Sequence, residues 1–380
     1  MIYGRKKTKP PEGRVPLLQA GLLVLVLVTG MQAGATEAGP VLTVLTWGGA
    51  YEASQRGAYF DPFTQATGIA IETVRYNGGL APLRQHLNGG AVSWDVVDMV
   101  QADAMAACEV GLLEPFNPGI LAPAPDGTPA REDFFEGAIL PCAITHLVFS
   151  TVLAYDDRAF AGVKPRSVAD FFDTERFPGK RALRKVPVGL LEWALLSHRV
   201  PRQQLYNLLS TQRGFDLAFR RLDQIGDQII WWESGDQPAK WLAEGRVVMA
   251  SGFNGRFFHA QTEGKAPISI IWDGQLLDYN GWAILKGTDQ KLLAEQFIAF
   301  ATRTEAMAAL ANRISYGPTR ESAQRHVGLH LLSRIPMRPH LPTTDEHMAS
   351  AIQRDHDWYA RTTSLRERLF RDWLRENFPE

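Results

Sequence analysis

Short apolar runs and amphipathic stretches alternate along the chain, and this alternation restricts the fold more than any other feature. Val41–Trp47 is an apolar, β-branched run typical of a buried strand, and Gly48-Gly49 ends it. Helical spacing follows at Tyr51–Thr67. Further strand candidates lie at Ile69–Tyr76 and Asp95–Val100, with a short helical stretch between them. The order strand, helix, strand, helix, strand predicts a mostly parallel sheet covered by helices.

The same alternation returns in the second half of the chain. His146–Tyr155 is a long strand candidate, and helical stretches follow it. Further strands are expected at Gln228–Trp232, Arg246–Ala250, Ile268–Trp272 and Gly281–Leu285. The tail from Ser322 onward has helical spacing with a polar face. The length suits two α/β units of ordinary domain size.

The N-terminus has the three parts of a secretory signal peptide. Basic residues precede an apolar run at Leu17–Val28, which is short for a membrane span. Ala33-Gly34-Ala35 then forms an A-x-A cleavage site before Thr36. We therefore expect residues 1–35 to be removed and the mature chain to be periplasmic. A permanent membrane anchor is the alternative.

The charge balance argues against nucleic acid as a partner. Loss of the leader removes five basic residues and one acidic residue from totals of 40 and 41, which leaves a formal net charge of −5. A mildly acidic chain has no basic excess to attract nucleic acid or an anionic membrane. With 45% hydrophobic and 21% charged residues, the composition is that of a globular protein with a full core. We expect a soluble monomer.

The chain has two cysteines, Cys108 and Cys142, and both lie beyond the leader. An even number of cysteines in an oxidising compartment predicts one disulfide between them. Two separate buried thiols are the alternative. A catalytic thiol is not expected, because neither residue belongs to a C-x-x-C motif or to a recognisable nucleophile motif.

No motif of catalytic or metal chemistry stands out. The sequence has no H-E-x-x-H, no Cys/His cluster with metal-ligand spacing and no G-x-S-x-G. Gly179-Lys180-Arg181 lacks the glycine-rich lead and the Ser/Thr of a phosphate loop. We therefore expect no enzyme, no metal and no cofactor, and a binding protein is favoured.

Aromatic residues gather where predicted strands end. Trp47 follows the first strand, Trp231-Trp232-Glu233 ends another, and Phe253-Asn254 follows a third. In an open α/β sheet, ligands bind outside the carboxyl ends of the strands. Aromatic faces with a few polar groups suit a small organic ligand, above all a cation. Trp231 and Trp232 are adjacent on a strand, so at most one of them faces a pocket.

Several short segments carry, in their order along the chain, a resemblance to a known family. They include TWGGAY at 46–51, YNGG at 76–79, FPGKR at 177–181, WWE at 231–233, FNGR at 253–256 and YGPTR at 316–320. In these segments the chain resembles the extracellular solute-binding proteins related to the spermidine/putrescine-binding group. The resemblance covers nearly all of the mature chain.

The resemblance implies a type II periplasmic-binding fold. Two α/β lobes, each a mostly parallel sheet flanked by helices, are joined by crossing strands, and the ligand lies in the cleft between them. One lobe is expected at 36–149 with 276–315 and the other at 150–275, with C-terminal helices at 316–380 packed on both. Hinge closure around the ligand is the expected motion. The implied partners are an ABC permease and, through it, its ATPase.

The resemblance and the strand ends together indicate the binding residues. An aromatic enclosure is expected from Trp47, Trp232, Phe253 and Tyr279. Its negative charge is expected from Glu233 and Asp278, and the rest of the set is Tyr51, Asn254, Asn280 and Tyr316. The two asparagines stand where polyamine binders often carry acids. A polyamine with two or more charges would therefore be held less well, because a charge-assisted hydrogen bond is worth more than a neutral one.

The expected function is capture of a small organic solute in the periplasm and its delivery to an ABC permease. A polyamine-like or other organic cation is the first expectation for the ligand. A neutral or zwitterionic solute, such as a sugar or an amino acid, is the alternative. An exported enzyme or a signalling module on the same fold is a further alternative, since a fold does not fix a function.

Overall fold

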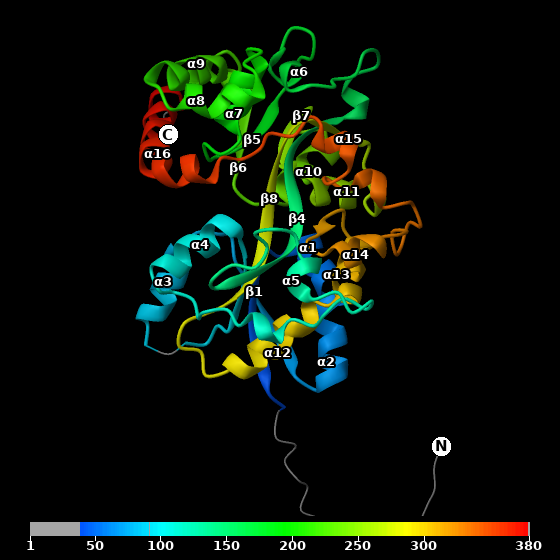
Figure 1. Ribbon diagram of the computed structural model, residues 1–380. Helices are drawn as coiled ribbons and strands as arrows, with labels where there is room; N and C mark the ends of the chain where they lie inside the picture. Colours follow the sequence, from blue (N-terminus) through cyan, green and yellow to red (C-terminus); the bar gives the residue numbers. More distant parts are fainter. Residues whose placement is uncertain (1–38, 91, 379–380) are drawn as a thin grey trace, which may run out of the picture. The chain divides into compact units, whose positions relative to one another are not determined.

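One mixed sheet lies at the centre of the molecule. The computed structural model describes residues 39–90 and 92–378, so the predicted leader at 1–35 lies outside the described residues. Within these ranges nine strands form one sheet in the order β2-β1-β3-β8-β4-β7-β5-β6, with β9 beside β4 (Figure 1). The strands are β1 (Val41–Thr46), β2 (Ala70–Arg75), β3 (Val96–Val100), β4 (Ala143–Asp156), β5 (Arg181–Arg184), β6 (Ile229–Trp232), β7 (Met249–Phe253), β8 (Ile268–Ile284) and β9 (Gly317–Pro318).

Two groups of three parallel strands lie at the two ends of this sheet. We call the part built on β1, β2 and β3 the first lobe, in which β1 lies between its two parallel neighbours. We call the part built on β5, β6 and β7 the second lobe, in which β5 takes the middle position. The antiparallel strands β4 and β8 pair with each other in both lobes, with an irregularity between Thr151 and Leu153. The chain therefore crosses between the lobes within continuous strands.

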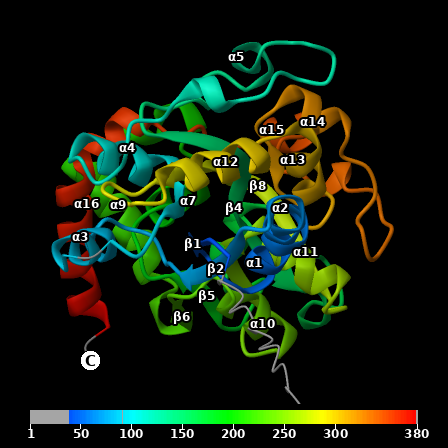
Figure 2. The same cartoon turned by 90° about the horizontal axis from the view of Figure 1, so that it is seen from below.

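Helices fill the connections and surround the strands (Figure 2). They are α1 (Gly49–Gln55), α2 (Asp61–Thr67), α3 (Ala81–Asn88), α4 (Gln101–Glu109), α5 (Ala130–Asp133), α6 (Val168–Phe172), α7 (Leu190–Ser197), α8 (Leu205–Leu209), α9 (Gln212–Asp223), α10 (Gln237–Ala243), α11 (Asn254–Thr262), α12 (Lys291–Ala301), α13 (Thr304–Ala311), α14 (Glu321–Arg325), α15 (Asp345–Met348) and α16 (His356–Asn377). A π-helical turn, Arg56–Phe60, joins α1 to α2. None of the helices in the described part of the chain has both the length and the apolar character of a membrane span.

Each lobe has a core cluster on either face of the sheet, because neighbouring residues of a strand point to opposite faces. In the first lobe, Val44 packs with α2, α12 and α13, whereas Leu45 packs with α3 and α4. In the second lobe, Leu153 packs with α6 to α9 and α16, whereas Val152 packs with α10 and α11. This two-sided cover confirms the α/β class that the alternation predicts.

β8 departs from the prediction. The sequence predicts separate strands at Ile268–Trp272 and Gly281–Leu285, whereas the structure has one strand of 17 residues. The sequence between these two segments includes polar residues, so its pattern does not indicate a strand. In the structure, polar side chains of this stretch are hydrogen-bonded to other protein groups. The Gln275 side chain accepts a hydrogen bond from Ser150 Oγ at 2.8 Å, and Asn280 Nδ2 donates to Asp98 at 3.0 Å. A pattern of apolar residues cannot reveal a strand whose buried side chains are polar and hydrogen-bonded.

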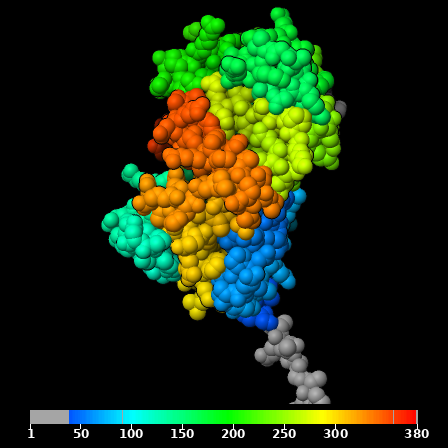
Figure 3. Space-filling model, turned by 90° about the vertical axis from the view of Figure 1, so that its right-hand side faces the viewer, coloured from blue at the N-terminus to red at the C-terminus, as the bar shows by residue number. Residues whose placement is uncertain are grey.

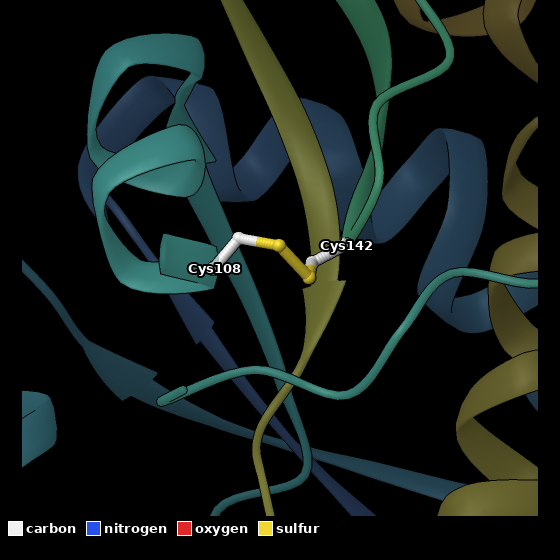
Figure 4. The surroundings of a disulfide bond; sticks show 2 residues. All are labelled: Cys108 and Cys142. Carbon is white, nitrogen blue, oxygen red and sulfur yellow. A yellow bond between two sulfur atoms is a disulfide. The ribbon is translucent and has the colours of Figure 1, made fainter. Parts of the chain in front are cut away.

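A disulfide ties α4 to the start of β4, as predicted (Figure 4). Cys108 lies in α4, Cys142 directly precedes β4, and their Cα atoms are 5.6 Å apart. Both cysteines pack in the core cluster under α3 and α4. The bridge spans 34 residues of sequence, for which the chain-entropy model gives a stabilisation of about 3–4 kcal/mol.

The C-terminal segment returns to the centre of the sheet. The Ile352 N–H donates to the carbonyl of Gln275 at 2.8 Å, and Ile352 lies beside Leu276 in a parallel bridge. α16 then packs into the second lobe, where Trp358 is buried. In the space-filling view the orange and red C-terminal part lies against both lobes (Figure 3). We propose the lobe boundaries that the sequence suggests, at 149/150, 275/276 and 315/316.

Candidate functional site

Large and charged side chains stand at the carboxyl ends of the parallel strands in both lobes. These ends follow β1, β2 and β3 in the first lobe and β5, β6 and β7 in the second. The crossing strand β8 adds a carboxylate between them. We call this group the interlobe site: Trp47, Tyr76, Asp103, Arg184, Trp232, Phe253 and Asp278. Its place matches the rule that open α/β sheets bind ligands at their carboxyl ends.

Both lobes contribute aromatic rings to the interlobe site. The ring centroids of Trp47 and Tyr76 lie 5.5 Å apart. Phe253 contacts Trp232 at 5.8 Å and Phe149 of β4 at 5.6 Å, in edge-to-face geometry. The indole Nε1 of Trp47 is buried without a hydrogen-bond partner among the described residues. Three of the four aromatic residues that the sequence predicts thus stand at strand ends, and Tyr279 lies half-buried on β8.

Trp231 and Trp232 point to opposite faces, as adjacent strand residues must. Trp232 is 1% exposed, and its Nε1 donates to Ser251 Oγ at 3.1 Å. Trp231 packs on the other face against Phe370 and Trp373 of α16, with ring centroids 6.0 and 6.1 Å away. Trp232 therefore lies on the face covered by α10 and α11, beside Phe253, and Trp231 belongs to the contact between β6 and α16.

Arg184 is a cation of the site that the sequence does not reveal. It is the last residue of β5, and its backbone N–H donates to Ser251 Oγ at 3.3 Å. Its guanidinium carbon lies 5.6 Å from the ring centroids of both Trp232 and Phe253. The guanidinium makes no ion pair with the described residues. Burial lowers its pKa, and the Asp103 and Asp278 carboxylates oppose that effect.

Asp103 faces this cation from the first lobe. It lies in the first turn of α4, directly beyond β3, and its carboxylate accepts the N–H of Gly79 at 2.8 Å. Burial raises its pKa, whereas the Gly79 N–H, Arg184 and Arg354 act in the opposite direction. A carboxylate of the first lobe and a guanidinium of the second lobe are therefore close enough to interact electrostatically.

Asp278 on β8 already has a cationic partner. Its carboxylate forms an ion pair with Arg354 of the C-terminal segment, and the two side chains are 11% and 9% exposed. The carboxylate also accepts the N–H of Tyr279 at 2.9 Å. Burial, followed by the nearby Asp278 charge, raises the pKa of Tyr279. The sequence places Asp278 in the site but gives no sign of Arg354.

Two other predicted residues hold a buried carboxylate of the first lobe. Asp98 of β3 is fully buried and accepts hydrogen bonds from Tyr51 at 2.6 Å, Gln55 at 2.7 Å and Asn280 at 3.0 Å. Burial, together with the charge of Asp98, raises the pKa of Tyr51 well above its usual value. The side chains of Tyr51 and Asn280 thus join α1 and β8 to β3 through this one carboxylate.

Asn254 and Tyr316 lie where the chain crosses between the lobes. Asn254 is fully buried; its Oδ1 accepts the N–H of Ser150 at 2.9 Å, and its Nδ2 donates to the carbonyl of Ser315. Tyr316 packs edge-on against Tyr51 with ring centroids 5.5 Å apart. Burial raises the pKa of Tyr316 to about 12. The amide of Asn254 therefore ties the second lobe to two crossing segments.

Comparison with known proteins agrees with this two-lobed geometry. A family model described as bacterial extracellular solute-binding protein matches residues 58–343. This chain belongs to that family. The match ends before the C-terminal segment that carries Arg354.

Named relatives cover most of this solute-binding protein. A gamma-aminobutyric acid-binding protein of Pseudomonas aeruginosa is 39% identical over 332 residues, 87% of this chain and 90% of the relative. The binding protein MotA from A. tumefaciens B6, in complex with glucopine, has a TM-score of 0.77 and 26% identity over 87% of this chain and 99% of MotA. A structure of a GABA receptor has a TM-score of 0.71 and 26% identity, covering 87% of this chain and 97% of that one.

The family confirms three predictions from the sequence. The solute-binding protein has the type II periplasmic-binding fold. Its family and relatives bind substrates and are not enzymes. Proteins of this kind bind a small molecule and deliver it to an ABC permease. Within residues 39–90 and 92–378, no group of three or more His, Cys, Asp and Glu residues has the arrangement of a metal site.

Glu233 is exposed in the solute-binding protein. Its carboxylate makes no ion pair with the described residues, and its N–H donates to Gln237 Oε1 at 2.9 Å. The residue that precedes α10 as its N-cap is Asp236. Glu233 thus stands beside the end of β6 without a partner that fixes its side chain.

The two lobes also contact each other through a group of charged residues that we call the interlobe latch. Asp236 of the second lobe accepts from Arg256 at 2.9 Å and pairs with Arg75 of the first lobe at 3.3 Å. Arg256 also donates to the carbonyl of Gly48 in the first lobe at 2.7 Å. A surface pocket of about 350 Å³ lies beside the latch, between α1, α10 and α11.

Proposed function

We propose that this solute-binding protein captures a small zwitterion with well-separated amino and carboxylate groups, such as γ-aminobutyric acid, and delivers it to an ABC permease. Arg184 carries this proposal. It presents a guanidinium at a strand end, equally near the rings of Trp232 and Phe253, and makes no ion pair with the described residues. A ligand carboxylate would supply the missing anion in the two-pronged geometry that guanidinium groups favour.

Asp103 is the proposed partner of the ligand's ammonium group. It belongs to the first lobe, whereas Arg184 belongs to the second. A ligand that reaches from one to the other makes contacts with both lobes, and these contacts exist only when the lobes are close. Such a ligand shifts the population toward the closed form.

The aromatic residues are proposed to enclose the methylene chain of the ligand. Trp47, Trp232, Phe253 and Tyr279 would supply apolar area and attract the ammonium group to their faces. We assign a supporting role behind this wall to Tyr51, Asn254, Asn280 and Tyr316, because their polar groups or rings are held by neighbouring residues. Glu233 is proposed to stand at the entrance.

A polyamine fits the charges of the site less well than a zwitterion. It brings no anion for Arg184, and the carboxylate of Asp278 is already paired with Arg354. The two cations, Arg184 and Arg354, therefore balance the two carboxylates, Asp103 and Asp278. A site with no net charge suits a ligand with no net charge. The 39% identical gamma-aminobutyric acid-binding protein supports the same ligand class.

Isothermal titration of the mature protein with γ-aminobutyric acid tests this proposal. We expect binding by the wild type and a loss of affinity of at least about tenfold in Arg184→Gln, because about 1.4 kcal/mol of charge-assisted interaction disappears. The exposed Arg213, changed to Gln, is the matched control and should bind like the wild type. Unchanged affinity in Arg184→Gln, or wild type that binds putrescine but not γ-aminobutyric acid, would contradict it.

The export of this protein belongs to the same proposal. We propose that the chain is cleaved after Ala35 and acts as a monomer in the periplasm, where a permease can receive it. Mass analysis of the secreted protein should find Thr36 at its N-terminus, and light scattering should give the mass of one chain. A retained leader would indicate a membrane-anchored form.

A further inference from the structure

Arg354 comes to the interlobe site through backbone pairing of the C-terminal segment. Ile352 and Leu276 form a parallel bridge, and the Ile352 N–H donates to the carbonyl of Gln275 at 2.8 Å. Two residues further along each segment are Arg354 and Asp278. Because parallel neighbours keep their register, the pairing places the guanidinium beside the carboxylate of the crossing strand.

The surroundings of Arg354 fix its guanidinium at this place. Its Nη1 donates to Asp278, and its guanidinium carbon lies 4.4 Å above the ring of Tyr359. Tyr359 is in turn held by Glu192, which also accepts from Tyr206 at 3.3 Å. Arg354 Nε is buried without a hydrogen-bond partner among the described residues. The cation is thus built into the fold and does not belong to a mobile surface side chain.

We infer that Arg354 sets the charge selectivity of the binding site, because it occupies the Asp278 carboxylate and so keeps that carboxylate from the ammonium groups of cationic ligands. This inference rests on the proposed interlobe site. With Arg354 in place, Asp103 is the one carboxylate among the seven residues of the interlobe site that makes no ion pair with the described residues, and Glu233 stands outside them at the entrance. A diamine has two ammonium groups, but only the Asp103 carboxylate of the site can accept from them. An ω-amino acid can place its ammonium group at Asp103 and its carboxylate at Arg184.

Removal of the Arg354 charge should change the preferred ligand. In Arg354→Met, which keeps a chain of similar length without charge, Asp278 becomes available to a second ammonium group. We expect the ratio of putrescine affinity to γ-aminobutyric acid affinity, measured by isothermal titration, to rise at least about tenfold. One additional charge-assisted hydrogen bond between the diamine and Asp278 accounts for a change of this size.

Three variants separate this inference from a general loss of structure. Arg354→Lys keeps the charge and should keep the wild-type preference. The double variant Arg354→Met/Asp278→Asn removes both charges and should return the ratio to the wild-type value. The control is Arg158→Met, which breaks another Arg–Asp pair of the second lobe, that with Asp156, and should leave the ratio unchanged.

The outcomes distinguish this inference from the proposed function. If the wild type does not bind γ-aminobutyric acid, the proposed ligand is wrong, yet a gain of putrescine affinity in Arg354→Met that disappears in the double variant still supports the role of Arg354. If Arg354→Met unfolds, Asp278→Asn gives the second test: an unpaired Arg354 should then raise affinity for the dianion glutarate. An unchanged ligand ratio in folded Arg354→Met, or no gain for glutarate in Asp278→Asn, overturns the inference.

Discussion

The polar side chains between the lobes differ in whether their hydrogen-bonding atoms are already occupied. Asn254 looks like a ligand contact from its position in the sequence, yet both polar atoms of its amide are bonded, to Ser150 and Ser315. The Nδ2 of Asn280 donates to Asp98, whereas its Oδ1 is buried without a partner among the described residues. Arg184 has no distinguishing mark in the sequence, yet its guanidinium lacks an anion among the described residues. Sequence position identifies which residues lie near the junction. Whether their polar atoms are already hydrogen-bonded decides their roles, and this depends on partners 61 to 182 residues away in the sequence.

Asn254→Ala tests the difference between a supporting and a ligand-binding residue. Loss of this amide leaves the buried Ser150 N–H and Ser315 carbonyl without partners, so the free energy of unfolding should fall by about 1–3 kcal/mol. Urea denaturation of the ligand-free protein measures this change, and the exposed Asn88, changed to Ala, is the control. Wild-type stability together with weakened ligand binding would make Asn254 a ligand contact instead.

At the scale of elements, the sequence predicts elements with an unbroken apolar pattern and misses those without one. Four of the six residues of β1 and four of the five residues of β3 are apolar, and both strands lie within the predicted ranges. β5 has only four residues, two of them arginines, so neither its strand nor Arg184 at its end is visible in the sequence. Arg181 is buried because its guanidinium donates to backbone carbonyls, among them that of Phe171 at 3.1 Å. Buried cations of this kind look like surface residues in a sequence.

A buried ion pair joins α5 to α14 and should make stability depend on pH. Asp133 accepts from Arg320 at 2.6 Å and from the Ser322 N–H at 2.8 Å. Burial alone would raise the pKa of Asp133, but hydrogen bonds from Ser322 and Arg320 outweigh it and hold the pKa below its usual value. A lowered pKa in the folded state gives a stabilisation that is present above the unfolded pKa of about 3.9 and is lost as pH falls through the folded pKa.

Asp133→Asn should therefore destabilise the protein by about 3–5 kcal/mol at pH 7, because Arg320 is left as a buried charge without its anion. The difference in unfolding free energy between this variant and the wild type should shrink as pH falls below about 4. Urea denaturation at a series of pH values measures it. The exposed Asp289, changed to Asn, should show no such trend, and a difference that stays constant with pH would contradict the assignment.

At the scale of the whole molecule, we expect the interlobe latch to link ligand affinity to closure of the lobes. Arg75 reaches Asp236 from the other lobe, and Arg256 holds the same carboxylate. Because Asp236 is 43% exposed, water and salt weaken these pairs. We therefore expect the latch to add a modest bias toward contact between the lobes, and the proposed ligand contacts to supply the larger part.

Asp236→Asn is expected to weaken γ-aminobutyric acid binding by up to about fivefold, which corresponds to about 1 kcal/mol for an exposed pair. The loss should be greatest at low ionic strength and should fade as added salt screens the latch of the wild type. Titrations at two salt concentrations measure both effects, with Asp289→Asn again as the control. Equal affinity at both concentrations in the variant and the wild type would remove the latch from the closing mechanism.

The position of β8 between β3 and β4 determines the order in which a newly made chain can fold. The first lobe needs residues 276–284 to join its two parts, yet these residues follow the whole of the second lobe in the sequence. Until they arrive, β3 and β4 expose facing edges that other chains can pair with. The Cys108–Cys142 bridge links α4 to the start of β4 and needs no residue of β8 to form. Once its two cysteines reach the oxidising compartment, the bridge can therefore hold both sides of this gap together before β8 has taken its place.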